Sequence, residues 1–327
     1  MQVLLNYNIW IIKCKKNFTF LKIFLNLGFS SFYGIFNTLK ISKKDMVNVK
    51  NCYIIINKND YKTTKHLVDN IIDYKVIDKI LIVDNNSSEE EVKLLKSIKN
   101  EKIELYLNNT DLGYAGAINK GTKYLTEKYE DCNFIISNSD VVIVSEKDIN
   151  SLLELLTYEK VGLVGPVILE RGKRVRGRKI PTVNKDIRFN IINKRDEDYS
   201  KSFYNDDVSQ VEVISSAFFL ITSSTLKRIG YLDDHSHLYY EDNILAFKIK
   251  KAGLMTLIDN NVVVKHLFSS TIENTMSSKE KFKDLYDSQV YFHTKYSKAT
   301  PFKIALLKLS NRYRYNIYRI KKLFKKK

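Results

Sequence analysis

The chain has 327 residues, of which 44% are hydrophobic and 12% aromatic, and a formal net charge of +17. This composition provides enough apolar surface for a packed core and excludes a disordered chain. The charge is uneven: residues 1–50 hold eight Lys and one Asp, residues 288–327 hold twelve Lys and Arg and no acid, and residues 51–287 sum to −2. A nucleic-acid enzyme usually carries its basic surface beside its catalytic cleft, so this distribution argues against nucleic acid and favours attachment through the ends.

The N-terminal region is predicted to be a basic, aromatic extension covering residues 1–50. Residues 23–39 form an uncharged window, but Asn, Ser and Gly dilute it below what a spanning helix needs. A segment lying in the membrane interface is therefore favoured, with a transmembrane helix as the alternative. The cysteines, Cys14, Cys52 and Cys132, are odd in number and widely spaced, which disfavours disulfides or a thiolate zinc site and fits a reducing cytosol.

From residue 52 onward, strands and helices are predicted to alternate. The expected strands are CYIIIN (52–57), KILIVDNNS (79–87), IELYLN (103–108) and NFIISNSD (133–140), and the expected helices are KTTKHLVDNIIDY (62–74), SSEEEVKLLKSI (87–98) and AGAINKGTKYL (115–125). This alternation predicts a parallel sheet covered by helices on both faces. Ligands of such sheets bind beyond the carboxyl ends of the strands, where Asp84 and Asp140 lie.

Asp140 ends an otherwise apolar strand, and burial would penalise its charge. Its position at a strand end allows a ligand to reach it, while an Asx turn that ends the strand is the alternative. The glycines in DLGYAGAINKGT are spaced differently from those of dinucleotide-binding and P-loop motifs, so both of these interpretations are disfavoured.

Six segments, in the same order, resemble the family 2 glycosyltransferases with the GT-A fold, especially the rhamnosyltransferase-like branch of bacterial surface-polysaccharide biosynthesis. They are ILIVDNNSSEEE, NNTDLGYAGAINKG, IISNSDVVI, VGLVGPVIL, the stretch from VEVISSAFF through YYEDN, and NNVVVKH. The resemblance implies an α/β GT-A catalytic domain at 51–268, with a mixed, mainly parallel sheet flanked by helices. We expect a basic helical region that associates with membranes at 269–327.

The resemblance also implies a nucleotide-diphospho-sugar donor and a divalent cation, Mg²⁺ or Mn²⁺, held by Asp140 and His266. The residues expected to bind the donor are Asn57, Asn59, Asp84, Asn86, Gly113, Gly116, Asn119 and Asn138. For the two glycines, turn and helix-start geometry is the alternative. For His266, the alternatives are a hydrogen-bonded surface group and a zinc site shared with His235 and His237.

YYEDN supplies the expected catalytic carboxylates. By resemblance, Asp242 is the general base that deprotonates the acceptor hydroxyl, with Glu241 beside it, and a single displacement implies inversion. The alternative is a pair of acids that only favours the helix dipole. Three residues depart from the family pattern, namely Asp111, Ser216 and Ile244, and they lie among the expected donor contacts.

Two basic segments flank or interrupt this pattern. Residues 170–188 hold eight basic residues and two acids, so they are either a solvated loop or a segment that closes over an anionic donor or lipid-diphosphate acceptor. Near the C-terminus, one helical face is predicted to be apolar and basic residues to surround it. This face comprises Phe302, Leu306, Leu309, Tyr313, Ile317, Ile320 and Phe324. It suits an anionic membrane surface, and the alternatives are packing on the enzyme's own core or an RNA-binding tail.

Together these features predict a metal-dependent inverting glycosyltransferase of the cytoplasm, peripheral on the inner face of the cytoplasmic membrane. Its acceptor is expected to be a glycan, carried on a lipid, in cell-surface polysaccharide assembly. No nucleic-acid partner is expected, and a homodimer is one open arrangement. The alternative function is a non-catalytic basic protein that binds membranes or nucleic acid on a degenerate α/β core.

Overall fold

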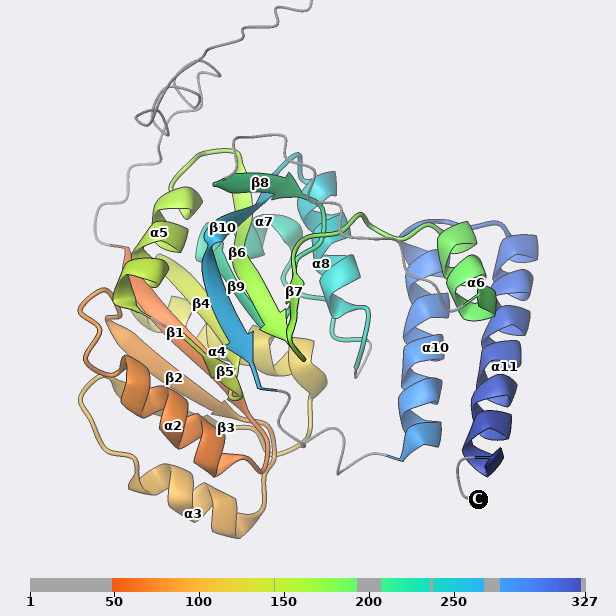
Figure 1. The fold of residues 1–327 in the computed structure, drawn as a ribbon. Coiled ribbons are helices and arrows are strands. Elements are labelled where there is room, and N and C mark those ends of the chain that lie inside the picture. The colour runs from red at the N-terminus through yellow and green to blue at the C-terminus, as the bar shows by residue number, and fades with distance from the viewer. Residues whose placement is uncertain (1–48, 144, 193–206, 236–237, 268–276, 325–327) are drawn as a thin grey trace, which may run out of the picture. The chain divides into compact units, whose positions relative to one another are not determined.

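The computed structural model describes residues 49–143, 145–192, 207–235, 238–267 and 277–324 (Figure 1). All of them belong to one compact unit of the chain. The predicted N-terminal window at 23–39 lies outside the described residues.

The first half of the sheet is parallel and follows the predicted alternation closely. Its order is β3 (Ile103–Leu107), β2 (Lys79–Asp84), β1 (Lys50–Asn57) and β4 (Cys132–Asn138). The connecting helices are α2 (Tyr61–Ile71), α3 (Glu89–Ser97) and α4 (Gly113–Tyr129). The predicted serine cap of α3 is present, because Ser88 Oγ accepts a hydrogen bond from Glu91 N. The central strands are continuous apolar runs because helices cover them on both faces.

The second half of the sheet is mixed. It contains β5 (Val141–Val142), β6 (Val161–Glu170), β7 (Lys173–Val175), β8 (Val208–Val211), β9 (Phe218–Thr222) and β10 (Met255–His266). Among the described residues the sheet order continues from β4 through β9, β6 and β10 to β5, with β9 and β5 antiparallel to their neighbours. The helices of this half are α5 (Glu146–Leu156), α7 (Ser223–Ile229) and α8 (Glu241–Lys251). The expectation of a mixed, mainly parallel sheet is confirmed.

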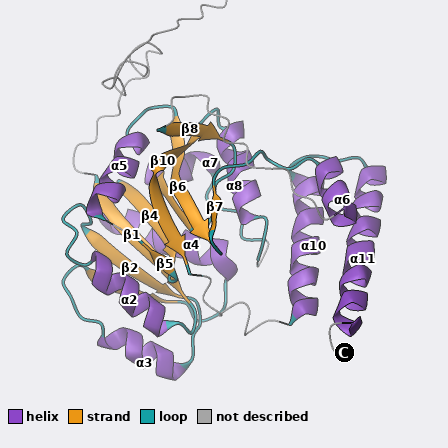
Figure 2. Ribbon diagram, viewed as in Figure 1, coloured by secondary structure: helices purple, strands orange, loops and turns teal. Residues whose placement is uncertain are grey.

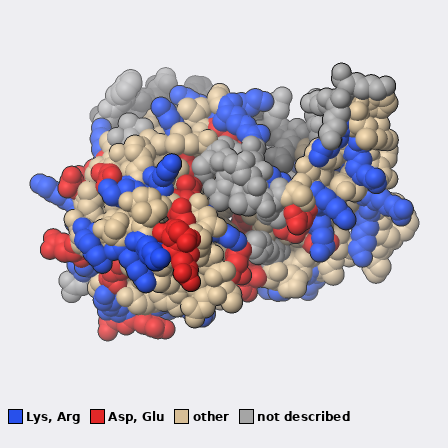
Figure 3. Space-filling model, turned by 90° about the horizontal axis from the view of Figure 1, so that it is seen from below, with Lys and Arg blue, Asp and Glu red and all other residues tan. Residues whose placement is uncertain are grey.

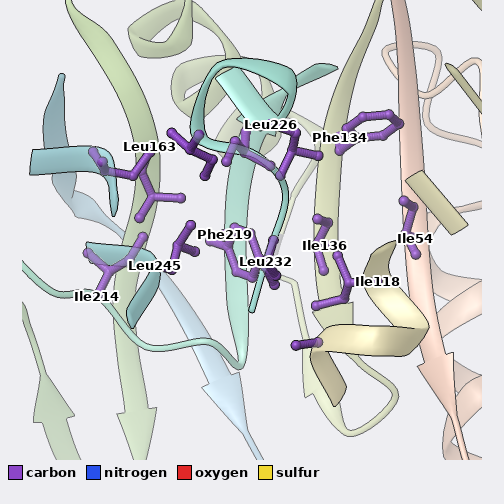
Figure 4. Close-up of a cluster of buried hydrophobic side chains, with 14 of the residues drawn as sticks. Ile54, Ile118, Phe134, Ile136, Leu163, Ile214, Phe219, Leu226, Leu232 and Leu245 are labelled. Atoms are coloured by element: carbon purple, nitrogen blue, oxygen red, sulfur yellow. The ribbon is translucent and has the colours of Figure 1, made fainter. Parts of the chain in front are cut away.

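The core lies on both sides of this sheet (Figure 2). On one side, residues of α4, α7 and α8 pack against the strands, and the close-up of this cluster shows Ile118, Leu226 and Leu245 facing strand residues such as Phe134 and Leu163 (Figure 4). Helices α2 and α5 contact the strands as well, and α3 contacts α2. Neighbouring residues of a strand point to opposite faces, and helices cover both faces of this sheet. Strands such as β1 are therefore buried over several successive positions.

The C-terminal region is helical, as predicted. Helix α10 (Ser278–Lys295) and helix α11 (Pro301–Phe324) lie beside α6 (Val183–Ile192), which the chain inserts between β7 and β8. Phe292 of α10 packs against Tyr240 and Ile244 at the start of α8, so α8 contacts the C-terminal helices directly. None of the helices in the described part of the chain has the length and apolarity to cross a bilayer.

Candidate active site

A buried hydrogen-bond network joins the ends of β1 and β2. Asn57 Nδ2 donates to Asp84 Oδ1 at 2.8 Å, and Ser87 donates to the same carboxylate from Oγ at 2.5 Å and from its backbone N at 3.0 Å. Thr64 Oγ1 donates to Asn57 Oδ1 at 2.8 Å. Asp84 is only 1% exposed, so its charge fixes the loops at this edge of the sheet. Direct contact of Asp84 with a nucleotide stays a prediction.

Asn59 and Asn86 lie in these loops with left-handed backbone, at φ of 50° and 65°. Asparagine tolerates this conformation better than most residues. Asn59 N donates to Ser87 Oγ at 2.7 Å, and Asn59 Oδ1 accepts from Ser88 N at 2.8 Å, so the loops after β1 and β2 hold each other. Asn86 is exposed at the same edge. The structure therefore places the predicted donor-binding residues Asn57, Asn59 and Asn86 in the same pair of loops, those after β1 and β2.

Sequence reasoning missed two residues here, Asn85 and Lys58. Asn85 Nδ2 donates to Asp111 Oδ1 at 2.7 Å and Asn85 Oδ1 accepts from Leu112 N at 3.0 Å, which ties β2 to the start of α4. Lys58 forms an ion pair with Asp111. Asp111 departs from the family pattern, in which an amide is usual. This replacement of an amide by an acid is the sequence signal that pointed to a nearby cation. The partner of Asp111 lies 53 residues away in the sequence, which concealed the pair.

The predicted residues of α4 have clear local roles. Gly113 has φ of 67°, which favours glycine, and a Cβ on Gly116 would lie 2.9 Å from Leu112 Cβ. Asn119 makes two hydrogen bonds to the backbone of Leu232: its Nδ2 donates to Leu232 O at 2.9 Å, and its Oδ1 accepts from Leu232 N at 3.0 Å. Asn119 thus fixes the segment that leads to the predicted catalytic carboxylates. Donor contacts by these three residues stay predictions.

The two predicted metal ligands meet although they lie far apart in the sequence. The chain turns at Asp140 into β5, and β5 pairs antiparallel with the end of β10, placing Val141 opposite His266. As a result Asp140 Oδ1 lies 3.2 Å from His266 Nε2, and Asn138 Nδ2 lies 3.5 Å from the same nitrogen. Asp140 is buried and lies beside an imidazole from a distant strand. An Asx turn that only ends β4 would need neither feature.

These side chains fit a cation that is held jointly with a substrate. A carboxylate and an imidazole provide two ligands, and Mg²⁺ or Mn²⁺ in such sites takes its other ligands from phosphates and water. A cluster of three or more His, Cys, Asp or Glu able to hold a metal by itself is absent from the described residues. The zinc alternative involves His237, which lies outside the described residues, and His235 stacks on Tyr291 with ring centroids 3.9 Å apart.

The predicted catalytic pair begins α8. Tyr239 and Tyr240 precede it with left-handed backbone, at φ of 70° and 67°, and turn the chain sharply into the helix. Asp242 Oδ2 accepts from Arg178 Nη2 at 2.6 Å. Arg178 belongs to the basic segment 170–188, which forms the β6–β7 hairpin and a bridge to Val213 and is therefore partly built into the sheet. Sequence reasoning grouped Arg178 with neighbouring arginines and missed its contact with the predicted base.

Glu241 lies in a more apolar environment than Asp242. Burial, and then the charge of Asp242, raise the pKa of the Glu241 carboxyl to about 7. Its Oε2 atom is buried and accepts no hydrogen bond from the described residues. A small cavity of about 10 Å³ is lined by the pair together with Tyr114 and Ser216, and the Tyr114 hydroxyl donates to Ser216 O at 2.5 Å. Tyr114 is therefore the wall of the site opposite the carboxylates.

Tyr114 also connects the two halves of the site. Burial, and then the charges of Glu241 and Asp140, raise the pKa of the Tyr114 hydroxyl well above its ordinary value. Both carboxylates thus act on one partly buried tyrosine. The predicted cation ligand and the predicted catalytic pair face one region at the carboxyl ends of the strands.

Behind the catalytic pair lies a buried polar cluster that sequence reasoning also missed. Asp186 of α6 accepts hydrogen bonds from the Tyr240 hydroxyl and, at 2.7 Å, from His293 Nε2 of α10. Gln289 Nε2 donates to the Tyr240 hydroxyl at 3.1 Å. The residue immediately before Glu241 is therefore anchored by α6 and by α10 of the C-terminal region.

Residues 52–213 match the family model Glycosyl transferase family 2. The chain belongs to glycosyl transferase family 2. This family 2 domain contains Asp84 at the end of β2 and Asp140 in the turn between β4 and β5, and α8 and His266 follow it in the chain.

Two curated relatives of this family 2 chain act in glycan biosynthesis by name. The low-salt glycan biosynthesis hexosyltransferase Agl10 of Haloferax volcanii is 21% identical over 253 residues, which are 75% of this chain and 78% of that protein. The O-antigen chain rhamnosyltransferase RfbN of Salmonella typhimurium is 23% identical over 221 residues. That alignment covers 65% of this chain and 63% of the relative, which is less than two thirds of its length.

Solved structures confirm the GT-A fold. The crystal structure of GalNAc-T7 with UDP, GalNAc and Mn²⁺ matches with a TM-score of 0.50 and 16% identity, over 68% of this chain and 44% of that chain. A crystal structure of a mycobacterial protein matches with a TM-score of 0.51 and 12% identity, over 78% of this chain and 77% of that one. At these identities the similarity establishes the fold alone.

Proposed function

We propose that the protein transfers a hexose or deoxyhexose from a nucleotide-diphosphate donor to a lipid-linked glycan, with inversion, during assembly of a cell-surface polysaccharide. The observation that supports this most is geometric: Asp140 lies 3.2 Å from His266, and Glu241 and Asp242 line one small cavity together with Tyr114. Both curated relatives are named for sugar transfer to glycans, which supports the same class of acceptor.

On the donor side, Asp140 and His266 are the proposed ligands of Mg²⁺ or Mn²⁺. A cation bound there would offset the negative charge that develops on the diphosphate as the glycosidic bond breaks. The loops of Asn57, Asn59 and Asp84 would line the nucleotide pocket at the same edge of the sheet. Lys58 and Asp111 form an ion pair beside these loops.

On the acceptor side, Asp242 is the proposed general base. Its carboxylate is partly exposed, and Arg178 holds Oδ2 at 2.6 Å and thereby fixes the orientation of the group. The environments of the two carboxylates differ: Asp242 is paired with an arginine, whereas burial raises the pKa of Glu241. Neighbouring acids in different environments are typical of sites that move a proton.

The proposed location is the inner face of the cytoplasmic membrane, reached through α11. Its buried residues Leu307, Ser310 and Asn311 face the other helices. Of the seven apolar residues predicted to form a membrane face, Ile317 is partly buried and the other six are exposed, namely Phe302, Leu306, Leu309, Tyr313, Ile320 and Phe324. Lys and Arg side chains gather on this helical part of the molecule, at the right of Figure 3. An apolar stripe beside basic residues suits the surface of an anionic bilayer.

The experiment that tests the activity is a screen of nucleotide sugars, each with and without Mn²⁺ or Mg²⁺. The correct donor should raise the midpoint of thermal unfolding, because a ligand that binds only the folded state stabilises it. It should also be hydrolysed or transferred in a metal-dependent reaction that Asp242→Asn slows strongly. Absence of stabilisation and turnover with every donor would favour the alternative of a non-catalytic binding protein.

A further inference from the structure

A groove of about 670 Å³ runs between α10 and α11, outside the catalytic site. Its apolar wall includes Phe282, Tyr286, Val290 and Tyr315, and the Phe282 ring lies 5.5 Å from that of Tyr286 and 5.6 Å from that of Tyr315. Along α10 the wall extends from Lys279 to Thr294, which corresponds to about 22 Å of helix. Volumes of about 300–1,000 Å³ are typical of sites that bind small ligands.

The rim of the groove is strongly basic. Four of its residues are cations, Lys279, Lys283, Lys308 and Arg312, and one, Asp287, is an acid. The Tyr286 hydroxyl is buried beside the groove and has no hydrogen-bond partner among the described residues. The aromatic wall suits a long apolar chain. The cationic rim and the Tyr286 hydroxyl suit an anionic, oxygen-rich head group on the same molecule.

The same groove is connected to the catalytic loop. Tyr291 lines it, and the Tyr291 hydroxyl donates to Asp233 Oδ2 at 2.9 Å. One turn earlier on α10, Ser288 Oγ donates to Leu238 O at 2.9 Å. Asp233 and Leu238 belong to the segment that leads directly to Glu241. A ligand in the groove would therefore lie against the helix that holds the acceptor side of the site.

We propose that the groove binds the apolar chain of the acceptor, a lipid that carries a phosphate head group, and that the rim cations bind the phosphate. This inference rests on the proposed function, since it assigns the acceptor of that reaction to a place in the fold. The groove is distinct from the exposed stripe of α11: a concave site takes a single chain, whereas the stripe faces a bilayer surface.

The test uses the full chain and farnesyl phosphate, an isoprenoid monophosphate, titrated calorimetrically below its aggregation concentration and without any donor. Farnesol and inorganic phosphate should each bind about tenfold more weakly or worse, because each lacks one half of the recognised molecule. Val290→Trp fills the groove and should weaken farnesyl phosphate binding about tenfold, whereas Ile320→Trp, on the exposed stripe, should bind like the wild type.

A second variant makes the test independent of core packing. Lys283 and Arg312 are exposed, so the double variant Lys283→Glu with Arg312→Glu should fold normally and lose most of the preference for farnesyl phosphate over farnesol. Equal binding by the wild type, Val290→Trp and the double variant would overturn the proposal. Binding of single-stranded oligouridylate in the groove, with no binding of farnesyl phosphate, would overturn it in favour of nucleic acid.

Sugar transfer distinguishes failure of this inference from failure of the proposed function. Val290→Trp should raise the KM for a lipid-linked acceptor and leave transfer to a lipid-free acceptor analogue unchanged. A wild-type enzyme that transfers sugar but binds no farnesyl phosphate would refute the proposed role of the groove and leave the proposed function intact. A protein that binds farnesyl phosphate but uses no nucleotide sugar would support the role of the groove and refute the proposed function.

Discussion

Arg178 Nη2 lies 2.6 Å from Asp242 Oδ2, while Nη1 of the same guanidinium donates to Asn243 Oδ1 at 2.5 Å. The backbone of Arg178 is itself fixed, because it exchanges two hydrogen bonds with Val213, at 3.0 and 2.8 Å. A planar cation on a backbone fixed by this isolated bridge therefore holds the first turn of α8. Such an arrangement orients a carboxylate more precisely than a flexible lysine would.

We expect Asp242→Asn to lower kcat by roughly 100-fold or more while the Kd for the donor barely changes, since only the acceptor must lose a proton. Arg178→Met should lower kcat by about tenfold without loss of donor binding, because the base is still present but less well oriented. Arg174→Met is the matched control on the exposed part of β7. Weaker donor binding in Asp242→Asn would instead place this carboxylate in the nucleotide pocket.

Asp140→Ala should abolish the dependence on Mg²⁺ or Mn²⁺ together with nearly all turnover, because it removes the carboxylate ligand. His266→Asn should raise the metal concentration that gives half-maximal activity by about tenfold, since the second ligand is replaced by a weaker one. Metal titrations of the initial rate measure both effects. Full wild-type turnover in excess chelator would contradict the assignment of a cation to these residues.

The raised pKa of Glu241 predicts how stability changes with pH. Between its ordinary value of 4.5 and about 7, the native state holds a proton that the unfolded chain releases. The free energy of unfolding should therefore fall as the pH rises through this window, and should change no further above it. Urea unfolding at pH 5 and pH 8 should show a larger drop for the wild type than for Glu241→Gln. An equal drop in both proteins would mean that Glu241 is ionised in the native state throughout.

Tyr240→Phe should destabilise the protein by about 1–3 kcal/mol, because it leaves a buried carboxylate and a buried amide each one partner short. The two groups are Asp186 and Gln289. Because Tyr240 precedes Glu241, kcat should fall as well at temperatures where the variant is fully folded. Tyr313→Phe, on the exposed side of α11, is the control for loss of a tyrosine hydroxyl. Wild-type stability and kcat for Tyr240→Phe would show that the cluster does not position the catalytic loop.

Membrane binding is best tested with point variants of α11. Deleting residues 301–327 would uncover the helices packed against Leu307, whereas Leu309 and Leu323 are exposed. Leu309→Ser with Leu323→Ser should release the protein from anionic liposomes, and added salt should weaken wild-type binding because the basic residues contribute. Leu94→Ser, at an exposed leucine of α3, should have no effect. Liposome binding that survives the double substitution would assign the attachment to another part of the chain.

The parts of this structure that were predictable from sequence depend on local patterns. Apolar runs and helical spacing predicted the strands and helices from β1 to β4, and the polar residues at strand ends predicted the edge where Asp84 and Asp140 lie. The predicted site positions came from the family resemblance.

The contacts that sequence reasoning missed join distant residues. Arg178 meets Asp242 across 64 residues, and Asp186 meets His293 across 107. A single sequence carries no periodic signal for such pairs. They form because β7 and α6 are insertions whose positions depend on the whole sheet, and an isolated arginine or aspartate in the sequence looks like an ordinary surface charge.

The antiparallel pairing of β5 with the end of β10 has a consequence for the order in which the protein becomes functional. Asp140 is synthesised with the first, locally folding half of the sheet, but its partner His266 is among the last residues of the last strand. A ribosome-bound chain that has emerged only as far as α7 would already contain the loops around Asp84 and lack His266, the second proposed cation ligand. Any affinity of such a chain for nucleotide should thus be insensitive to Mn²⁺, and metal-dependent binding should begin only once β10 has folded against β6.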